Sequence, residues 1–180
     1  MRDADFLRKN EGGITFSGGE PTMQSEFLAE LSHLLSSVHK CIETCGYCSK
    51  KVFSSVLEEM DYIIFDLKLI DSAKHRRYTG VDNRLILDNL ELLKESGRPF
   101  TIRIPVIPGV NDDDTNLNAA AALLEGVPSL EQVELLPYHL TAGAKYPMVG
   151  LSYRPGFPAE KRPRLNTDIF RQHGIACTHL

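Results

Sequence analysis

Short apolar runs alternate with amphipathic helical patterns along most of this 180-residue chain. The apolar runs are rich in β-branched and aromatic residues, which favours buried strands. The segments between them repeat apolar residues every three or four positions, which is typical of a helix with one buried face. The pattern predicts strands at 13–16, 40–44, 62–65, 100–104, 132–136 and 175–178, and helices at 24–37, 49–60, 85–96, 115–125 and 159–173.

This alternation predicts an α/β fold, in which parallel strands form a sheet with helices outside it. Five βα units are too few for a closed eight-unit barrel, so we expect a partial TIM-like barrel forming a single domain over 1–180. Residues 1–11 resemble the end of a helix, and we expect the first βα unit of the barrel to be absent. Segments 71–83 and 140–158 show neither the apolar runs of a buried strand nor the three-to-four-residue spacing of a helix, and they are expected to be irregular.

The helix expected at 24–37 shows the amphipathic pattern clearly. Its apolar residues recur at helical spacing, so we expect all of them to face the core. The predicted buried face consists of Phe27, Leu28, Leu31, Leu34, Leu35 and Val38.

Composition excludes several classes of protein. No apolar run is long enough to span a membrane, and the first residues do not form a signal peptide. The net charge is -4 without a long basic block, which argues against nucleic acid as a partner. Four cysteines without a secretory signal are typical of a reducing compartment, and we expect a cytoplasmic protein.

Polar residues follow five of the predicted strands at the same end. In βα folds the reactive groups gather at the carboxyl ends of the strands, so we expect these residues to share a pocket. Adjacent glycines after the first strand offer a bare backbone that a ligand can approach. Lysine and glycine carbonyl groups together suit a zwitterionic ligand, and neighbouring carboxylates suit a hard cation. The residues are Gly18, Gly19, Glu20, Glu43, Thr44, Asp66, Lys68, Arg103 and His139.

Several segments, taken together, resemble a known family. The chain is similar to radical S-adenosylmethionine (radical SAM) enzymes, and within them to the activating enzymes of glycyl radical enzymes. The similarity covers nearly the whole chain in the order of that family. The similar segments are Gly12-Gly-Ile-Thr-Phe-Ser-Gly-Gly-Glu-Pro21, Glu43-Thr-Cys-Gly-Tyr47, Asp66-Leu-Lys68, Asp71-x3-His75-x3-Thr79-Gly80-Val-x-Asn83, Arg103-Ile-Pro-Val-Ile-Pro-Gly-Val-Asn-Asp112 and Leu135-Leu-Pro-Tyr-His139.

The resemblance implies residue roles. Gly18, Gly19 and Glu20 would border the methionine end of S-adenosylmethionine, and His139 would contact its nucleoside. The segment 66–68 would hold the carboxylate side and the ribose region. A monovalent cation would be bound by Glu43, Thr44 and Asp66. The residues expected to bind the cofactor are Gly18, Gly19, Glu20, Asp66, Leu67, Lys68, Arg103 and His139.

The resemblance also implies a reaction and partners. A [4Fe-4S] cluster reductively cleaves S-adenosylmethionine, and the resulting 5′-deoxyadenosyl radical abstracts hydrogen from a glycine of the partner enzyme. Pyruvate formate-lyase is the first expected partner, with flavodoxin or ferredoxin as electron donor. The alternatives are activation of a different glycyl radical enzyme, a non-catalytic domain that docks such an enzyme, and an aldolase-like enzyme using Lys68 as a Schiff-base amine.

The chain departs from the family in its cysteines. The family carries its cluster ligands as CxxxCxxC before the GGE segment, but no cysteine precedes Gly12 here. Cys41, Cys45 and Cys48 have this spacing further along, where the first lies within a predicted strand and the last in a loop. We therefore expect neither an iron–sulfur cluster nor a structural zinc with His39 at these thiols, and we expect the chain alone to be inactive. Cys177 is expected to be a buried thiol.

Overall fold

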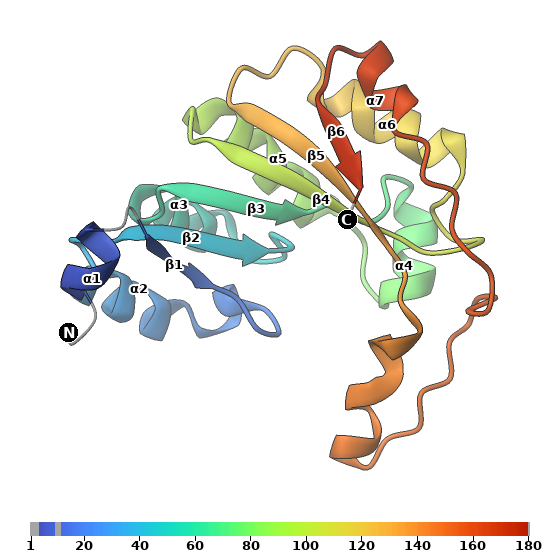
Figure 1. Ribbon diagram of the computed structural model, residues 1–180, viewed down its shortest axis with the longest axis horizontal. Coiled ribbons are helices and arrows are strands. Elements are labelled where there is room, and N and C mark those ends of the chain that lie inside the picture. The colour runs from blue at the N-terminus through green and yellow to red at the C-terminus, as the bar shows by residue number, and fades with distance from the viewer. Residues whose placement is uncertain (1–3, 10–11, 180) are drawn as a thin grey trace. The chain divides into compact units, whose positions relative to one another are not determined.

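Six strands form one parallel sheet in the computed structural model, which describes residues 4–9 and 12–179 (Figure 1). The strands are hydrogen-bonded in sequence order, from first to last. This order confirms the prediction of an α/β fold built from successive βα units. The strands are β1 (Gly13–Phe16), β2 (His39–Thr44), β3 (Tyr62–Asp66), β4 (Phe100–Val106), β5 (Leu130–Pro137) and β6 (Cys177–His179).

Helices connect the strands, as the amphipathic patterns indicate. Three of the connecting elements are short 3-10 turns, two of them in the segment 140–158 that was expected to be irregular. The α-helices are α1 (Ala4–Lys9), α2 (Ser25–Leu34), α3 (Lys50–Glu59), α4 (Ser72–Thr79), α5 (Arg84–Ser96), α6 (Asp114–Leu124) and α7 (Asp168–Gln172), and the 3-10 turns are η1 (Pro21–Gln24), η2 (Leu140–Lys145) and η3 (Pro147–Val149).

Two expectations about helices are wrong. Residues 71–83 contain α4, whose amino end is capped by the Asp71 carboxylate accepting from the Lys74 amide at 2.7 Å and whose carboxyl end is Gly80 in the left-handed region. This helix is polar, and His75 is its only buried residue. Its sequence therefore lacks the apolar residues at helical spacing that would have predicted it. The helix expected at 159–173 shrinks to α7, because Pro163 lies within the expected span and cannot continue a helix.

The chain divides into two compact units, which are described separately below. The first unit comprises Met1–Asp66, Asn83–Ile102 and Val127–Glu131. The second unit comprises Leu67–Asp82, Arg103–Gly126 and Gln132–Leu180.

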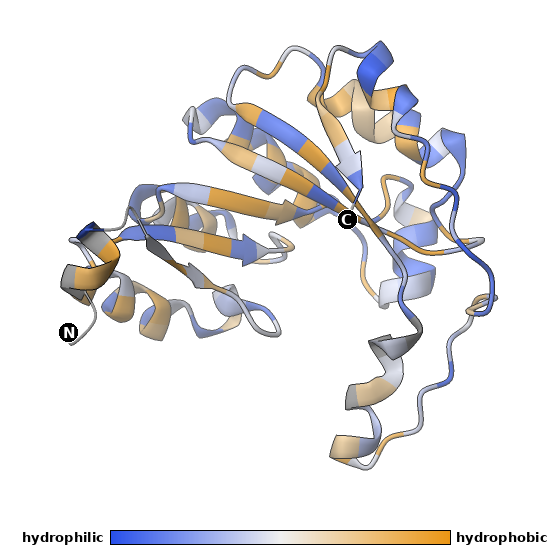
Figure 2. Ribbon diagram, viewed as in Figure 1, coloured by the Kyte–Doolittle hydropathy of each residue, from blue (hydrophilic) through white to orange (hydrophobic). Residues whose placement is uncertain are grey.

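The sheet of the first unit has one fully buried face. Ile42, Ile63 and Phe65 are completely buried, and α2, α3 and α5 pack in a row with α3 in the middle. Side chains alternate along a strand, so the intervening residues of β2 and β3 point to the opposite, half-buried face. The register pairs Cys41 with Tyr62 across the two strands. Figure 2 shows the apolar residues of these strands as bands separated by polar positions.

Helix α2 buries less of its apolar surface than its sequence predicts. Leu28 and Leu35 are buried as expected, but Phe27 is 60% exposed and Leu34 is 76% exposed. An apolar stripe of this width exceeds what α3 and the sheet cover in the first unit, so the expectation for these two side chains is wrong.

The second unit has its own apolar core. Ile104 and Val106 of β4 and Leu135 of β5 are completely buried, and α6 packs against α7. Val133 of β5 pairs in register with Cys177 of β6. The Cys177 thiol is buried, as predicted, and burial raises its pKa to about 11.

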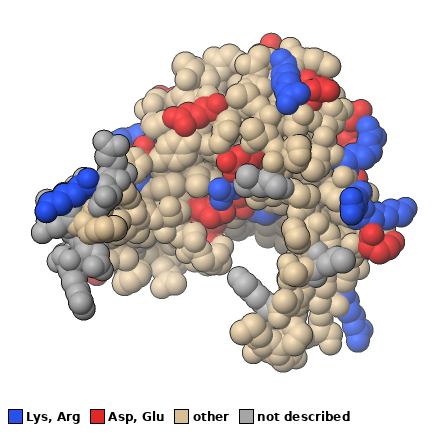
Figure 3. Space-filling model, in the orientation of Figure 1, with Lys and Arg blue, Asp and Glu red and all other residues tan. Residues whose placement is uncertain are grey.

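The surface carries charged side chains of both signs. On the face shown in Figure 3, acidic and basic side chains are interspersed, and neither sign forms an unbroken patch among the coloured residues. In the described part of the chain, no helix combines the length and the apolar character that crossing a membrane requires.

Candidate functional site

The glycine pair after β1 presents an open backbone. Gly18 has φ +123°, a conformation that side chains rarely adopt. A Cβ atom built on either Gly18 or Gly19 meets no described atom within 4 Å. The chain thus carries two exposed peptide groups with free space beside them, at the carboxyl end of a strand where ligands bind in βα folds.

The carboxylate of Glu20 ties this loop to the end of β2. Its Oε1 accepts from the Thr22 amide at 3.1 Å, the Thr22 hydroxyl at 2.8 Å and the Thr44 hydroxyl at 2.7 Å. Its Oε2 accepts from the Cys45 amide at 2.9 Å. Both oxygens are therefore engaged within the first unit, and the side chain holds the loop in place instead of projecting towards a ligand.

Hydrogen bonding lowers the pKa of Glu20. Burial desolvates the carboxylate and by itself raises the pKa, but the hydrogen bonds from Thr44, Cys45 and Thr22 outweigh that penalty. The pKa therefore lies below its ordinary value of 4.5. The carboxylate stays ionised at neutral pH, which strengthens each of these hydrogen bonds.

The loop after β2 is held from a second side by α5. Asn89 is 1% exposed, and its Nδ2 donates to the carbonyl oxygens of Gly46 and Cys48, both at 2.9 Å. Gly46 has φ +67°, and a Cβ there would collide with the ring of Phe65. Sequence analysis did not single out Asn89, because an asparagine within a helix carries no recognisable signal of a partner 43 residues away.

The predicted cation ligands divide between the two faces of the sheet. Thr44 is buried, and its hydroxyl donates to Glu20 and accepts from the Gly46 amide at 3.0 Å. Glu43 points to the opposite, half-buried face, so the two side chains cannot share an ion. Asp66 lies two residues beyond Ile64, the register partner of Glu43, which places both carboxylates on one face of neighbouring strands.

The three cysteines of the CxxxCxxC spacing do not converge. Cys41 lies within β2, and the three residue steps from Cys41 to Thr44 along the strand span about 10 Å. The Cys45 amide donates to Glu20, and burial raises the pKa of the Cys48 thiol. Among residues 4–9 and 12–179, no three His, Cys, Asp or Glu side chains are placed to hold a metal ion.

The segment after β3 begins the second unit at Leu67. Leu67 is a core residue, 2% exposed, and its amide donates to the Arg103 carbonyl oxygen at 2.8 Å. Neither its side chain nor its amide group is therefore available to contact a ligand. Lys68 is half-buried. Its carbonyl oxygen accepts from Nδ2 of the buried Asn111, which also donates to the carbonyl oxygen of Pro105. The backbone that carries Lys68 is thereby fixed.

Arg103 forms an ion pair that the sequence did not reveal. Its Nε donates to Oε2 of Glu134 on β5 at 2.7 Å, and the two side chains are 22% and 13% exposed. Gln132 donates to the other oxygen of Glu134 at 3.0 Å. Glu134 thus neutralises and orients the guanidinium. Its alternation with the buried Val133 and Leu135 is the only sequence signal that places it on the face of Gln132.

His139 is exposed at the start of η2, in the second unit. It lines a cavity of about 470 Å³ together with Tyr138, Lys161 and Arg162. Tyr138 is fixed there by its hydroxyl, 3.0 Å from that of Tyr153. The cavity therefore combines a histidine, an aromatic ring and two cationic side chains.

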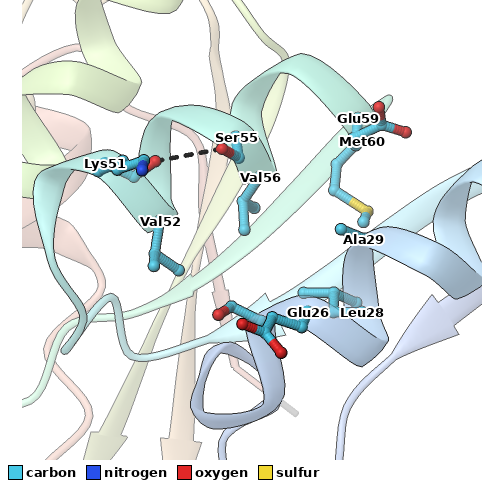
Figure 4. Close-up of a pocket in the computed structure, with 10 residues that line it drawn as sticks. Glu26, Leu28, Ala29, Lys51, Val52, Ser55, Val56, Glu59 and Met60 are labelled. Carbon is cyan, nitrogen blue, oxygen red and sulfur yellow. Dashed lines mark hydrogen bonds between the residues drawn. The ribbon is translucent and has the colours of Figure 1, made fainter.

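A groove of about 310 Å³ lies between α2 and α3 (Figure 4). The Ser55 hydroxyl on its wall donates to the Lys51 carbonyl oxygen at 3.2 Å. Glu59 accepts from the Ser32 hydroxyl at 3.0 Å and pairs with the buried Lys40. The Ser55 and Glu59 side chains are therefore engaged in local structure.

A protein-family model, the radical SAM superfamily, matches residues 1–118, which include the glycine pair and the Glu20 hydrogen bonds. The chain belongs to the radical SAM superfamily. This result confirms the family that the sequence motifs suggested.

Relatives within this superfamily are activating enzymes of glycyl radical enzymes. The 4-hydroxyphenylacetate decarboxylase activating enzyme of Clostridioides difficile is 39% identical over 98% of this chain and 57% of its own length. The isethionate sulfite-lyase activating enzyme of Nitratidesulfovibrio vulgaris is 39% identical over 81% of this chain and 48% of its own length. The chain thus spans about half the length of these relatives.

A solved structure extends the similarity to the fold. A domain of a pyruvate-formate lyase-activating enzyme from Bacteroides vulgatus superposes with a TM-score of 0.74 at 30% sequence identity. The superposition covers 94% of this chain and 99% of that domain. The radical SAM superfamily implies S-adenosylmethionine and a [4Fe-4S] cluster. The thiols of the described residues do not fit the cluster, so we assign no chemical step to them.

Proposed function

We propose that this radical SAM chain is the S-adenosylmethionine-binding portion of an enzyme that activates a glycyl radical enzyme. The observation that carries the proposal is the open backbone of Gly18 and Gly19, held in place by Glu20. S-adenosylmethionine supplies the radical chemistry of this superfamily when it is bound.

The first unit would bind the methionine end. The carbonyl groups of Gly18 and Gly19 would accept from the ammonium group, since nothing beside them obstructs a ligand. Glu43 and Asp66 share one sheet face and would hold a monovalent cation with oxygen ligands. Thr44 would add only its carbonyl oxygen, because its hydroxyl is engaged with Glu20.

For the second unit, considered by itself, we infer the residue roles that the family resemblance implies for Lys68, Arg103 and His139. Lys68 would pair with the carboxylate of S-adenosylmethionine as a point charge on a fixed backbone. His139 would contact the nucleoside from the wall of its cavity. Arg103 would act while paired with Glu134, so it would present an oriented guanidinium with its charge partly neutralised.

The partner enzyme is inferred to be a glycyl radical enzyme other than pyruvate formate-lyase. Pyruvate formate-lyase was the first expectation, and the solved domain of Bacteroides vulgatus carries that name. The sequence relatives, with identities of 39%, are named for 4-hydroxyphenylacetate decarboxylase and isethionate sulfite-lyase, which favours the alternative. A flavodoxin or ferredoxin would supply the electron. Four free thiols support a reducing compartment such as the cytoplasm.

Calorimetric titration of the chain with S-adenosylmethionine tests the proposal. We expect binding, and we expect Lys68→Ala and His139→Ala each to weaken it about tenfold, the effect of losing roughly 1.4 kcal/mol of binding free energy. Lys51→Ala and His33→Ala are matched controls, since both side chains lie on exposed helix surface of the first unit. They should leave the affinity unchanged.

Absence of binding by the unsubstituted chain would contradict the proposed function. Binding that is equally strong in the Lys68 and His139 variants would contradict the residue assignment while keeping the ligand.

A further inference from the structure

Residues 44–48, which connect β2 to α3, are held by hydrogen bonds from two side chains on opposite sides of the loop, within the first unit. From one side, Glu20 binds the Thr44 hydroxyl and the Cys45 amide. From the other, Asn89 of α5 binds the carbonyl oxygens of Gly46 and Cys48. The two side chains together take up two donors and two acceptors of this loop.

We propose that Asn89 is a positioning residue for the methionine end of the S-adenosylmethionine site. The inference rests on the proposed function and extends it to a residue that contacts only the loop. Asn89 fixes the loop, the loop supplies two of the donors to Glu20, and Glu20 fixes the glycine pair.

Burial makes this chain of contacts sensitive to the chemistry of residue 89. Asn89 is 1% exposed, so a donor lost there takes one hydrogen bond from the carbonyl oxygen of the buried Gly46 and one from that of the half-buried Cys48. Gly46 cannot move towards β3 to compensate, because the Phe65 ring occupies that space. The remaining direction of relaxation carries Cys45 away from Glu20 and releases the glycine backbone.

The amide of Asn89 also lies 3.8 Å from the Cys48 thiol. Movement of the loop would therefore uncover this half-buried thiol. Its alkylation rate reports the loop position independently of any ligand.

Asn89→Asp is the sharpest variant, because it keeps the shape of the side chain and turns the donor into an acceptor that faces two carbonyl oxygens. Asn89→Ser is a second variant that removes the contacts without adding charge. Asn118→Asp is the matched control, since Asn118 is an asparagine on α6 whose amide donates to a single exposed backbone carbonyl. Each variant is titrated with S-adenosylmethionine and with 5′-methylthioadenosine, which lacks the amino-acid end.

The expected result is selective. Asn89→Asp and Asn89→Ser lower the affinity for S-adenosylmethionine about tenfold, change that for 5′-methylthioadenosine less than about twofold, and accelerate iodoacetamide labelling of Cys48. The control changes none of these quantities.

An equal loss of both ligands would indicate general destabilisation and overturn the positioning role, as would unchanged affinity for S-adenosylmethionine. If the unsubstituted chain binds neither ligand, the proposed function itself fails. These outcomes are distinguishable because the first two require binding by the unsubstituted chain.

Discussion

At the scale of the residue, Glu20 shows how a motif can identify a position without identifying its role. The sequence predicted that Glu20 borders the cofactor, because it follows two glycines at a strand end. In the structure its oxygens accept four hydrogen bonds from Thr22, Thr44 and Cys45. A carboxylate engaged in this way acts on a ligand through the backbone that it positions, and its contribution should therefore appear in stability as well as in binding.

Glu20→Gln should destabilise the first unit by about 2 kcal/mol, because an amide replaces a charged acceptor and turns an N–H group towards a donor. The Glu20 pKa is lowered in the folded chain, so its ionised form stabilises the fold above the ordinary value of 4.5. That contribution disappears as the pH falls through the lowered pKa. Urea unfolding of both proteins from pH 7 to pH 3 measures the difference.

The difference between the two free energies of unfolding should be largest near pH 7 and should shrink below pH 4.5. Glu30→Gln, at an exposed position in the middle of α2, is the control and should alter stability at neither pH. A Glu20→Gln difference that is constant with pH would show that the carboxylate charge does not stabilise the loop.

At the scale of the element, the loop after β2 depends on one glycine for two separate reasons. Gly46 takes a positive φ, and its missing Cβ makes room for the Phe65 ring. Gly97, at the end of α5, takes nearly the same φ of +69° but has no described atom within 4 Å of a built Cβ. Substituting alanine at Gly97 therefore measures the destabilisation from backbone strain alone, and substituting it at Gly46 measures that strain together with a steric clash.

Gly97→Ala should cost about 1 kcal/mol, the strain of placing an alanine in the left-handed region. Gly46→Ala should cost about 2 kcal/mol more, because the Phe65 ring must also move within a packed core. Thermal and urea unfolding of both variants measure the two costs. Equal destabilisation would show that the ring adjusts freely and that the loop is less constrained than the structure indicates.

Sequence analysis placed two helices wrongly, for opposite reasons. Helix α4 has an amino-terminal cap and a carboxyl-terminal glycine but a polar body, so only its ends could have been recognised. The helix expected at 159–173 failed for the opposite reason, since charged and apolar residues suggested a period that Pro163 interrupts. In both helices the residues that begin, end or interrupt the backbone hydrogen bonding determined the structure, and the apolar or polar composition did not.

At the scale of the whole molecule, the sequence predicted the fold well because strand order follows chain order. Each strand is a distinct apolar run, and hydrogen-bonding each strand to the next in sequence requires no knowledge of distant contacts. The polar residues at the strand ends could be located for the same reason, and their roles stay predictions. What the sequence could not supply were pairings between distant residues, such as Arg103 with Glu134 and Asn89 with Gly46, which exist only once the strands and helices are packed.

Gly19 differs from most glycines that a fold preserves. Its φ is not in the left-handed region, and no described atom lies within 4 Å of a Cβ atom built there. A saturation library at residue 19 selected for soluble, folded protein should therefore accept many amino acids, whereas the same library selected for retention of S-adenosylmethionine should return almost only glycine. Residue 19 would then record a selective pressure that comes from the ligand alone, and a comparison of the two libraries would map the footprint of the ligand on the chain without a structure of the complex.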